Sequence, residues 1–305
     1  MPQVQFADSS QLKPAAAPVP SHIVDRITDR TGALPQLQLM FEEQLGLLWL
    51  VMHPEPKPVF TLPLVDSVLR VQNALRAMVD AGEPMPVEVL AYRTSGPVFS
   101  LGGDLDYYID CLARRDRAGL ARYAETACAV IEGNTTGLGG RVATVAAVHG
   151  RALGGGIDPA RACHVVVAED SASFCYPEIN YNHFPIAAAP SLARRIGAVE
   201  AERILLSGKS FTAAEFYDKG ALEAVVGDGA SAMWVRDFCK KTAASRRSRI
   251  AIAAAFNRMG PDLAAELAGA GAAWVDHMLA LDQAEITKLQ RIVQAQDRML
   301  GRMAG

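Results

Sequence analysis

The chain has 305 residues, half of them hydrophobic, which is enough to bury the core of one large globular domain and to leave a smaller appended part. Its formal net charge of -3 gives no overall attraction to nucleic acid or to an anionic membrane, so we expect neither as a partner. No apolar run reaches the length of a membrane span, and no charged and apolar leader opens the chain. The five cysteines are odd in number and scattered, without ligand spacing, so we expect a cytoplasmic protein with reduced thiols and no metal.

Residues 1–34 combine several prolines and an alanine run with little apolar periodicity, which predicts a flexible N-terminal arm. From residue 35 to 230 short apolar strand patterns alternate with helical ones, which predicts the core of an α/β protein. The order strand, strand, helix, strand at its start indicates a repeated ββα unit. The predicted elements are strands at 37–41, 47–52, 87–92, 142–148 and 164–168, and helices at 64–78, 112–132 and 160–163.

After residue 231 the strand signals stop. Apolar residues then recur at helical spacing, from Val275 to Val293, and predict long amphipathic helices. The region 231–305 is therefore predicted to be helical and to form core or a subunit interface.

A glycine cluster carries the first chemical signal. Residues 149–158 pass from a buried strand through Gly154, Gly155 and Gly156 into a helix start. Glycines let backbone N–H groups approach a ligand closely, and a helix N-terminus attracts negative charge. Such a segment suits the developing oxyanion of a thioester. It resembles the signature of the crotonase (enoyl-CoA hydratase/isomerase) superfamily, in which a glutamate stands two residues after the last glycine.

Two further segments extend this resemblance. Residues 99–105 are similar to the other oxyanion-hole segment of the superfamily, and residues 176–179 with Pro185 are similar to the segment that bears a second glutamate. The resemblance implies that the N–H groups of Gly103 and Gly155 hold the thioester oxygen, and that Glu178 and Asp158 face the substrate as acid and base. By the same resemblance, the residues implied in substrate binding are Leu101, Gly102, Gly154 and Gly156.

The resemblance runs from about residue 37 to 226. It implies an α/β fold of the ClpP/crotonase type, a spiral of repeated ββα units followed by a C-terminal helical oligomerisation region. It also implies a homotrimer or a dimer of trimers, no cofactor, and a substrate carried on acyl carrier protein or coenzyme A.

Three stretches, 101–105, 137–141 and 274–296, are similar to bacterial synthases of diffusible signal factor. Those enzymes dehydrate a 3-hydroxyacyl chain on acyl carrier protein and hydrolyse the thioester to release a free cis-2-unsaturated fatty acid. Two alternatives stay open: an enoyl-CoA hydratase or isomerase acting on acyl-CoA, and a catalytically silent relative that binds or regulates.

The sequence departs from the family pattern at Asp158. Aspartate replaces the family glutamate and is shorter by one carbon, or roughly 1.5 Å of reach. Pro159 follows directly, and Asp before Pro is typical of a helix start with Asp as the N-cap. Asp158 is therefore predicted either to reach the substrate or a bound water, or to serve only as a cap.

Some weaker signals keep two interpretations each. His183 is either a second proton carrier or, more simply, a structural hydrogen-bonding residue. The basic clusters at 114–117 and 240–249 are interpreted in two ways. They bind the phosphates of coenzyme A or the acidic face of a carrier protein, or they are simply solvated helix faces.

Overall fold

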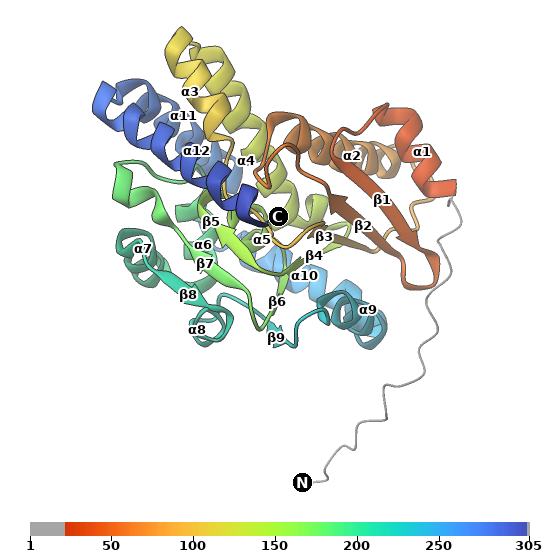
Figure 1. Cartoon of the computed structure of the whole chain (residues 1–305). Coiled ribbons are helices and arrows are strands. Elements are labelled where there is room, and N and C mark those ends of the chain that lie inside the picture. Colours follow the sequence, from red (N-terminus) through yellow and green to blue (C-terminus); the bar gives the residue numbers. More distant parts are fainter. Residues whose placement is uncertain (1–21, 304–305) are drawn as a thin grey trace.

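The structure is a computed structural model that describes residues 22–303 (Figure 1). A six-stranded sheet forms its centre, in the order β1-β2-β3-β4-β6-β9, with β1 antiparallel to β2 and the remaining pairs parallel. A smaller sheet has the order β5-β7-β8. The strands are β1 (Leu37–Glu42), β2 (Leu47–Met52), β3 (Val89–Thr94), β4 (Ala143–Val148), β5 (Arg151–Leu153), β6 (Val165–Glu169), β7 (Ser173–Cys175), β8 (Ser210–Thr212) and β9 (Ala224–Val226).

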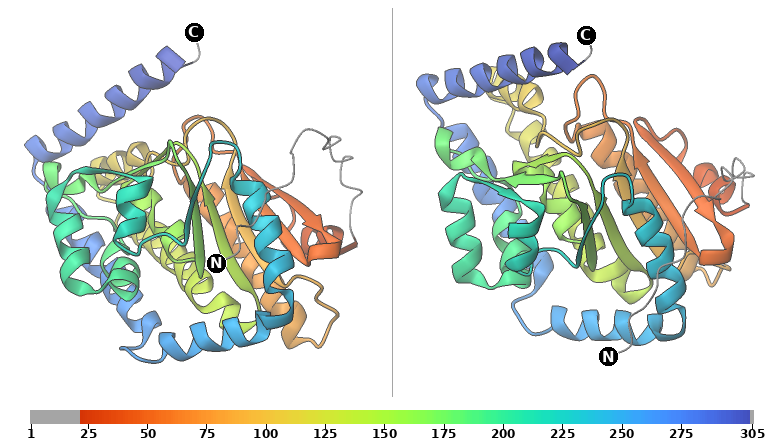
Figure 2. Two further views of the ribbon diagram at one scale, coloured as in Figure 1. Left: turned by 90° about the horizontal axis from the view of Figure 1, so that it is seen from below. Right: turned by 60° about the horizontal axis from the view of Figure 1, so that its bottom comes forward.

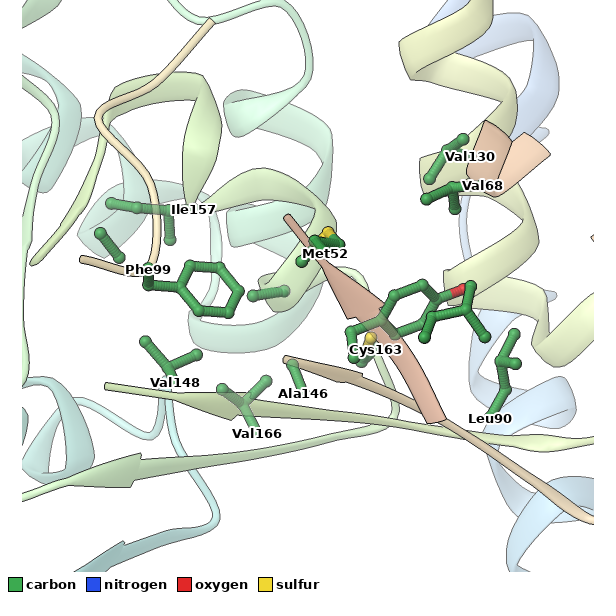
Figure 3. Packing of buried hydrophobic residues seen from close by; sticks show 14 of the residues in the cluster. Met52, Val68, Leu90, Phe99, Val130, Ala146, Val148, Ile157, Cys163 and Val166 are labelled. Carbon is green, nitrogen blue, oxygen red and sulfur yellow. The ribbon is translucent and has the colours of Figure 1, made fainter. Parts of the chain in front are cut away.

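Helices cover both faces of the central sheet, which explains why β2 and β4 are buried along their whole length. On one face, α2 (Leu62–Asp80), α4 (Arg117–Gly140) and α5 (Asp158–Arg161) enclose the main core, where Val68 of α2 lies beside Val130 of α4, and Val148 of β4 lies beside Val166 of β6 (Figure 3). On the other face, α9 (Ser231–Thr242) packs through Val235 and Cys239.

The remaining helices surround this centre. A second core cluster joins α3 (Leu105–Arg114) and α4 to α11 (Leu263–Ala280) and α12 (Gln283–Met303). Figure 2 shows α12, in blue, as a separate outer layer of the molecule. The other helices are α1 (His22–Thr31), α6 (Ala188–Ile196), α7 (Ala198–Ser207), α8 (Ala213–Asp218) and α10 (Arg246–Asn257), with short 3-10 helices η1 (Glu43–Leu45), η2 (Gly154–Gly156), η3 (Pro177–Tyr181) and η4 (Ala243–Ser245).

The predicted α/β order is confirmed, and the described chain after Ser231 is helical as expected. The prediction of a flexible arm over residues 1–34 is corrected in part. Residues 1–21 lie outside the described residues, but residues 22–31 form α1, whose Ile23 and Ile27 are buried against the core. Arg26 and Arg30 of this helix pair with Glu83. Two isoleucines four residues apart make one apolar helix face, a signal too short to stand out beside the prolines.

The predicted helix at 112–132 is also corrected, because it is two helices. Arg115 adopts a left-handed conformation with φ 52° and ends α3. Asp116 then starts α4, with its side chain accepting a hydrogen bond from the Gly119 N–H. Among the described residues, no helix is long and apolar enough to cross a membrane.

Candidate active site

A cavity of about 330 Å³ opens beside the glycine segments. Its walls are mostly apolar and aromatic side chains from α2, α3, α4, α11 and α12. Seven of the eight predicted site residues line it: Leu101, Gly102, Gly103, Gly154, Gly155, Asp158 and Glu178. The fold therefore brings together, from three separate segments, the groups that the sequence analysis proposed.

Backbone pairing holds the two glycine segments side by side. The Ser100 N–H donates to the Arg151 carbonyl (3.0 Å), and the Leu153 N–H donates back to the Ser100 carbonyl (2.9 Å). Gly156 is the exception among the predicted substrate-binding residues, because it does not line the cavity. A Cβ at Gly156 would overlap the Ser100 side chain and lie 3.1 Å from the Gly102 Cα. Its role is to let the two segments approach each other, which corrects its predicted contact with substrate.

Glu178 lies in η3 and is only 7% exposed. Its Oε1 accepts a hydrogen bond from the Gly155 N–H at 2.9 Å, and its Oε2 is buried without a partner among the described residues. Gly154 has a φ of +53°, and a Cβ there would overlap the Glu178 carboxylate. Burial raises the pKa of Glu178 to about 7, although the Gly155 N–H opposes this shift.

Asp158 is 2% exposed and faces the same cavity. Its Oδ1 accepts a hydrogen bond from the Tyr176 hydroxyl at 3.0 Å. Burial, and then the nearby charge of Glu178, raise its pKa well above the usual value, which favours the protonated form. The capping alternative is wrong: α5 begins at Asp158 itself, its N-cap is Ile157, and no side chain caps it.

Sequence reasoning missed three tyrosines. Tyr176 holds Asp158, as described, and stands two residues before Glu178 in the recognised segment. Tyr108 is buried, and a Cβ at Gly103 would overlap its hydroxyl. Tyr123 packs edge-on against Tyr108, with ring centroids 4.9 Å apart, and donates to the Phe60 carbonyl (2.6 Å). The adjacent Tyr107 and Tyr108 at the start of α3 gave no pattern that separates a site residue from core.

His183 lines the cavity but is poorly suited to carry protons. Burial lowers its pKa to about 3, and the neighbouring His277 adds to this shift, so the ring is neutral. Its Nδ1 is buried without a partner among the described residues, and its ring lies 5.9 Å from that of Trp274. Its backbone N–H donates to the Glu178 carbonyl (3.1 Å), which helps to fix η3.

The C-terminal helix closes one side of the cavity. The residues of α12 that line it are Ile292, Ala295, Gln296 and Met299. Lys57 pairs with Asp297 of α12 at 2.8 Å and with Asp106 of α3 at 2.6 Å, so one lysine joins the helix to the rest of the site. Within the described chain, no group of three or more potential ligands forms a metal site.

This geometry agrees with a sequence comparison. The enoyl-CoA hydratase/isomerase family model matches residues 75–272, more than half of the chain. The chain belongs to this family. A probable enoyl-CoA hydratase from Bacillus subtilis (strain 168) is 30% identical over 142 residues, which are 46% of this chain and 51% of the relative. A mevalonyl-coenzyme A hydratase from Beauveria bassiana (strain ARSEF 2860) is 32% identical over 165 residues, which are 52% of this chain and 56% of that relative.

The chain thus spans about half the length of these curated relatives. A wider match comes from solved structures. The crystal structure of human mitochondrial delta3-delta2-enoyl-CoA isomerase superposes with a TM-score of 0.72, over 87% of this chain and 99% of that chain, at 17% identity. The predicted crotonase fold of this family member is thereby confirmed, together with its C-terminal helical region.

Proposed function

We propose that this hydratase/isomerase family member acts on an acyl-coenzyme A thioester. The reaction is the addition of water to a carbon–carbon double bond, the elimination of water to form one, or the movement of the double bond along the chain. One observation carries the proposal. A buried carboxyl group with a pKa of about 7, Glu178, is hydrogen-bonded to a backbone N–H at the wall of a mostly apolar cavity. A group whose pKa lies near the working pH both accepts and donates protons efficiently.

The thioester carbonyl belongs at the glycine pair. On binding, the carbonyl oxygen takes the place of Glu178 Oε1 at the Gly155 N–H, with the Gly103 N–H as the second donor. Negative charge that develops on that oxygen is then held by two fixed dipoles; the loss of one such donor typically costs about 10²- to 10³-fold in rate. The displaced Glu178 carboxylate is left beside the carbon next to the carbonyl, where it removes or returns a proton.

The two carboxyl groups divide the work by position. Burial favours the protonated form of Asp158, which can protonate a departing hydroxyl. Glu178 is close to half ionised at neutral pH and can act as the base. In dehydration Glu178 takes the proton from the carbon next to the carbonyl while Asp158 protonates the hydroxyl, which leaves as water. Hydration is the reverse: Glu178 returns its proton to the carbon, and the Asp158 carboxylate takes one from the water. Isomerisation of the double bond needs only Glu178.

A second candidate is the synthase of a diffusible signal factor, which dehydrates a 3-hydroxyacyl chain on acyl carrier protein and then hydrolyses the thioester. The observation that favours it is the pair of buried carboxyl groups at one cavity, since a protonated Asp158 can protonate a departing hydroxyl while Glu178 takes the carbon-bound proton. The apolar wall of α2, α4 and α12 would hold the fatty chain.

A parallel assay separates these candidates. The purified protein is incubated with a 3-hydroxyacyl chain and with a 3-enoyl chain, each on coenzyme A and on acyl carrier protein, and the products are identified by chromatography and mass spectrometry. An unsaturated acyl-coenzyme A supports the first candidate, and a free unsaturated acid from the carrier protein supports the second. Binding without product on either carrier contradicts both and favours the catalytically silent relative.

We also propose a homotrimer, or a dimer of trimers, in the cytoplasm. Support for assembly comes from α10 and the turn after it, where Ile252, Phe256 and Met259 are among the most exposed large apolar side chains of the described residues. Light scattering coupled to size exclusion measures the mass. A monomer at micromolar concentration would contradict the proposed assembly.

A further inference from the structure

A second cavity, of about 720 Å³, lies on the side of α5 away from the proposed active site. Its walls come from the chain around α5 and β6, from α6, and from α9 and α10, and no residue lines both cavities. Five arginines line it, and no aspartate or glutamate does: Arg161, Arg194, Arg195, Arg246 and Arg249. Hydroxyl groups from Thr135, Ser191, Thr242, Ser245 and Ser248 also line its wall.

Arg161 is the deepest of these charges. Arg161 is only 2% exposed, and its Nη1 donates to the Ala221 carbonyl. Its Nε and Nη2 are buried without a partner, and no carboxylate of the described residues forms an ion pair with it. Burial lowers its pKa to about 10, so it remains charged at neutral pH. A buried guanidinium in this state is costly unless an anion approaches it.

The neighbouring charges do not balance Arg161. Arg195 pairs with Glu223 and donates to the His164 carbonyl (3.1 Å), and burial, followed by the positive charge of Arg161, lowers the pKa of Arg195. The Glu223 carboxylate is thus engaged by Arg195 and forms no ion pair with Arg161. Arg249 has no ion pair among the described residues and lies 5.9 Å from the ring of Phe238. The positive charge of the cavity thus exceeds what its own surroundings neutralise.

We propose that this second cavity binds a phosphate-type oxyanion, with Arg161 as its buried ligand. A guanidinium offers two parallel N–H donors in the geometry that a phosphate oxygen pair accepts, and the two unpartnered nitrogens of Arg161 supply such a pair. Arg249 and the Ser248 hydroxyl, both on α10, would contact the anion from the solvent side. Phe238 and Phe256 on the same wall suit the organic part of a phosphate ester.

Isothermal titration in a phosphate-free buffer tests this site, with inorganic phosphate and adenosine monophosphate as the two probes. The wild type is expected to bind at least one of them. Arg161→Met should weaken binding more than 10-fold. The matched control is Arg247→Met, because Arg247 is exposed on α10 and does not line the cavity, and this variant should bind as the wild type does. Tighter binding of the nucleotide identifies an ester as the ligand, and equal binding identifies free phosphate.

Thermal unfolding separates ligation from a structural role. Without phosphate, Arg161→Met should be as stable as the wild type or more stable, because it removes an unpaired buried charge. With phosphate, only the wild type and Arg247→Met should gain stability. Should Arg161→Met fail to fold, Arg249→Met is compared with Arg247→Met and is expected to bind severalfold more weakly. No binding of either probe to the wild type, or undiminished binding in the cavity variants, overturns the proposal.

Discussion

Glu178 and Asp158 show how one fold gives two carboxyl groups different work. Both are buried at the same cavity, but Glu178 accepts a hydrogen bond from a backbone N–H, which favours its charged form, and Asp158 feels the charge of Glu178. Burial is the main cause of the raised pKa of both groups, and these contacts add to it for Asp158 and oppose it for Glu178. The sequence pointed to both positions through motif spacing. It could not supply Tyr176 or Tyr108, because their contacts with Asp158 and Gly103 depend on how distant segments pack.

The raised pKa of Glu178 predicts a pH-dependent stability. The carboxyl group titrates near 4.5 in the unfolded chain and near 7 in the folded one, so the folded state binds more protons between these values. The free energy of unfolding therefore falls as pH rises through this window, by up to about 3 kcal/mol from this group. Urea unfolding at pH 5 and pH 8 should show Glu178→Gln gaining on the wild type as pH rises. A constant difference between the two proteins contradicts the assigned shift.

Asp158 has a prediction of its own. Asp158→Asn keeps an acceptor for the Tyr176 hydroxyl but removes the carboxyl group that exchanges a proton with the water, so hydration of a 2-enoyl thioester should fall about 10²- to 10⁴-fold. Exchange of the proton next to the carbonyl, which needs only Glu178, should persist within a few-fold. Steady-state kinetics and proton exchange are measured on the same preparation. Equal losses in both reactions would show that Asp158 acts through structure and not as an acid.

Among the elements, those with a long apolar pattern were predictable and those fixed by one or two residues were not. The strand β2 is a continuous apolar run, β4 is apolar except for Thr144, and both were found with nearly correct bounds. The break between α3 and α4 depends on the left-handed conformation of Arg115. An arginine in the sequence does not indicate such a conformation. The stretch 137–141, used as a sign of one enzyme branch, has a local cause as well: Gly137, Leu138 and Gly139 have positive φ where α4 turns toward β4.

Helix α1 yields a prediction about stability. Ile27 is fully buried against the core, so Ile27→Ala should lower the free energy of unfolding by about 2–5 kcal/mol. Leu206→Ala is the matched control, because Leu206 is 61% exposed on α7, and it should change stability by less than about 0.5 kcal/mol. Urea unfolding of the wild type and both variants at one pH measures these differences in the free energy of unfolding. Wild-type stability in Ile27→Ala would mean that α1 is not docked in solution.

At the scale of the whole molecule, α12 turns an open cleft into a closed cavity. The sequence predicted a long amphipathic helix at 275–293, but periodicity cannot say which surface a helix covers. Its path across the site is set by the Lys57 ion pairs and by the Gln296 side chain, which donates to the Leu101 carbonyl at 3.4 Å. The fold class, by contrast, followed from the order of strands and helices and from three spaced motifs.

The apolar face of α12 should therefore affect acyl-chain preference. Ile292→Ser places a hydroxyl in the cavity wall, and we expect KM for a long-chain thioester to rise about 10-fold, with little change for a four-carbon one. Gln294→Ser, on the exposed side of the same helix, should leave both values unchanged. Steady-state kinetics with the two chain lengths measure the effect. An equal change in KM for both substrates would exclude α12 from contact with the acyl chain.

The most direct test of the central claim is proton exchange on a substrate that cannot react further. A saturated acyl-coenzyme A, butyryl-coenzyme A, is incubated in D₂O with the wild type, with Glu178→Gln, and with Glu202→Gln, an exposed control on α7. Mass spectrometry then measures deuterium on the carbon next to the carbonyl. We predict exchange in the wild type and the control, and a loss of at least about 10²-fold in Glu178→Gln. Equal exchange in Glu178→Gln, or none in the wild type, would contradict the assignment of Glu178 as the base at a polarised thioester.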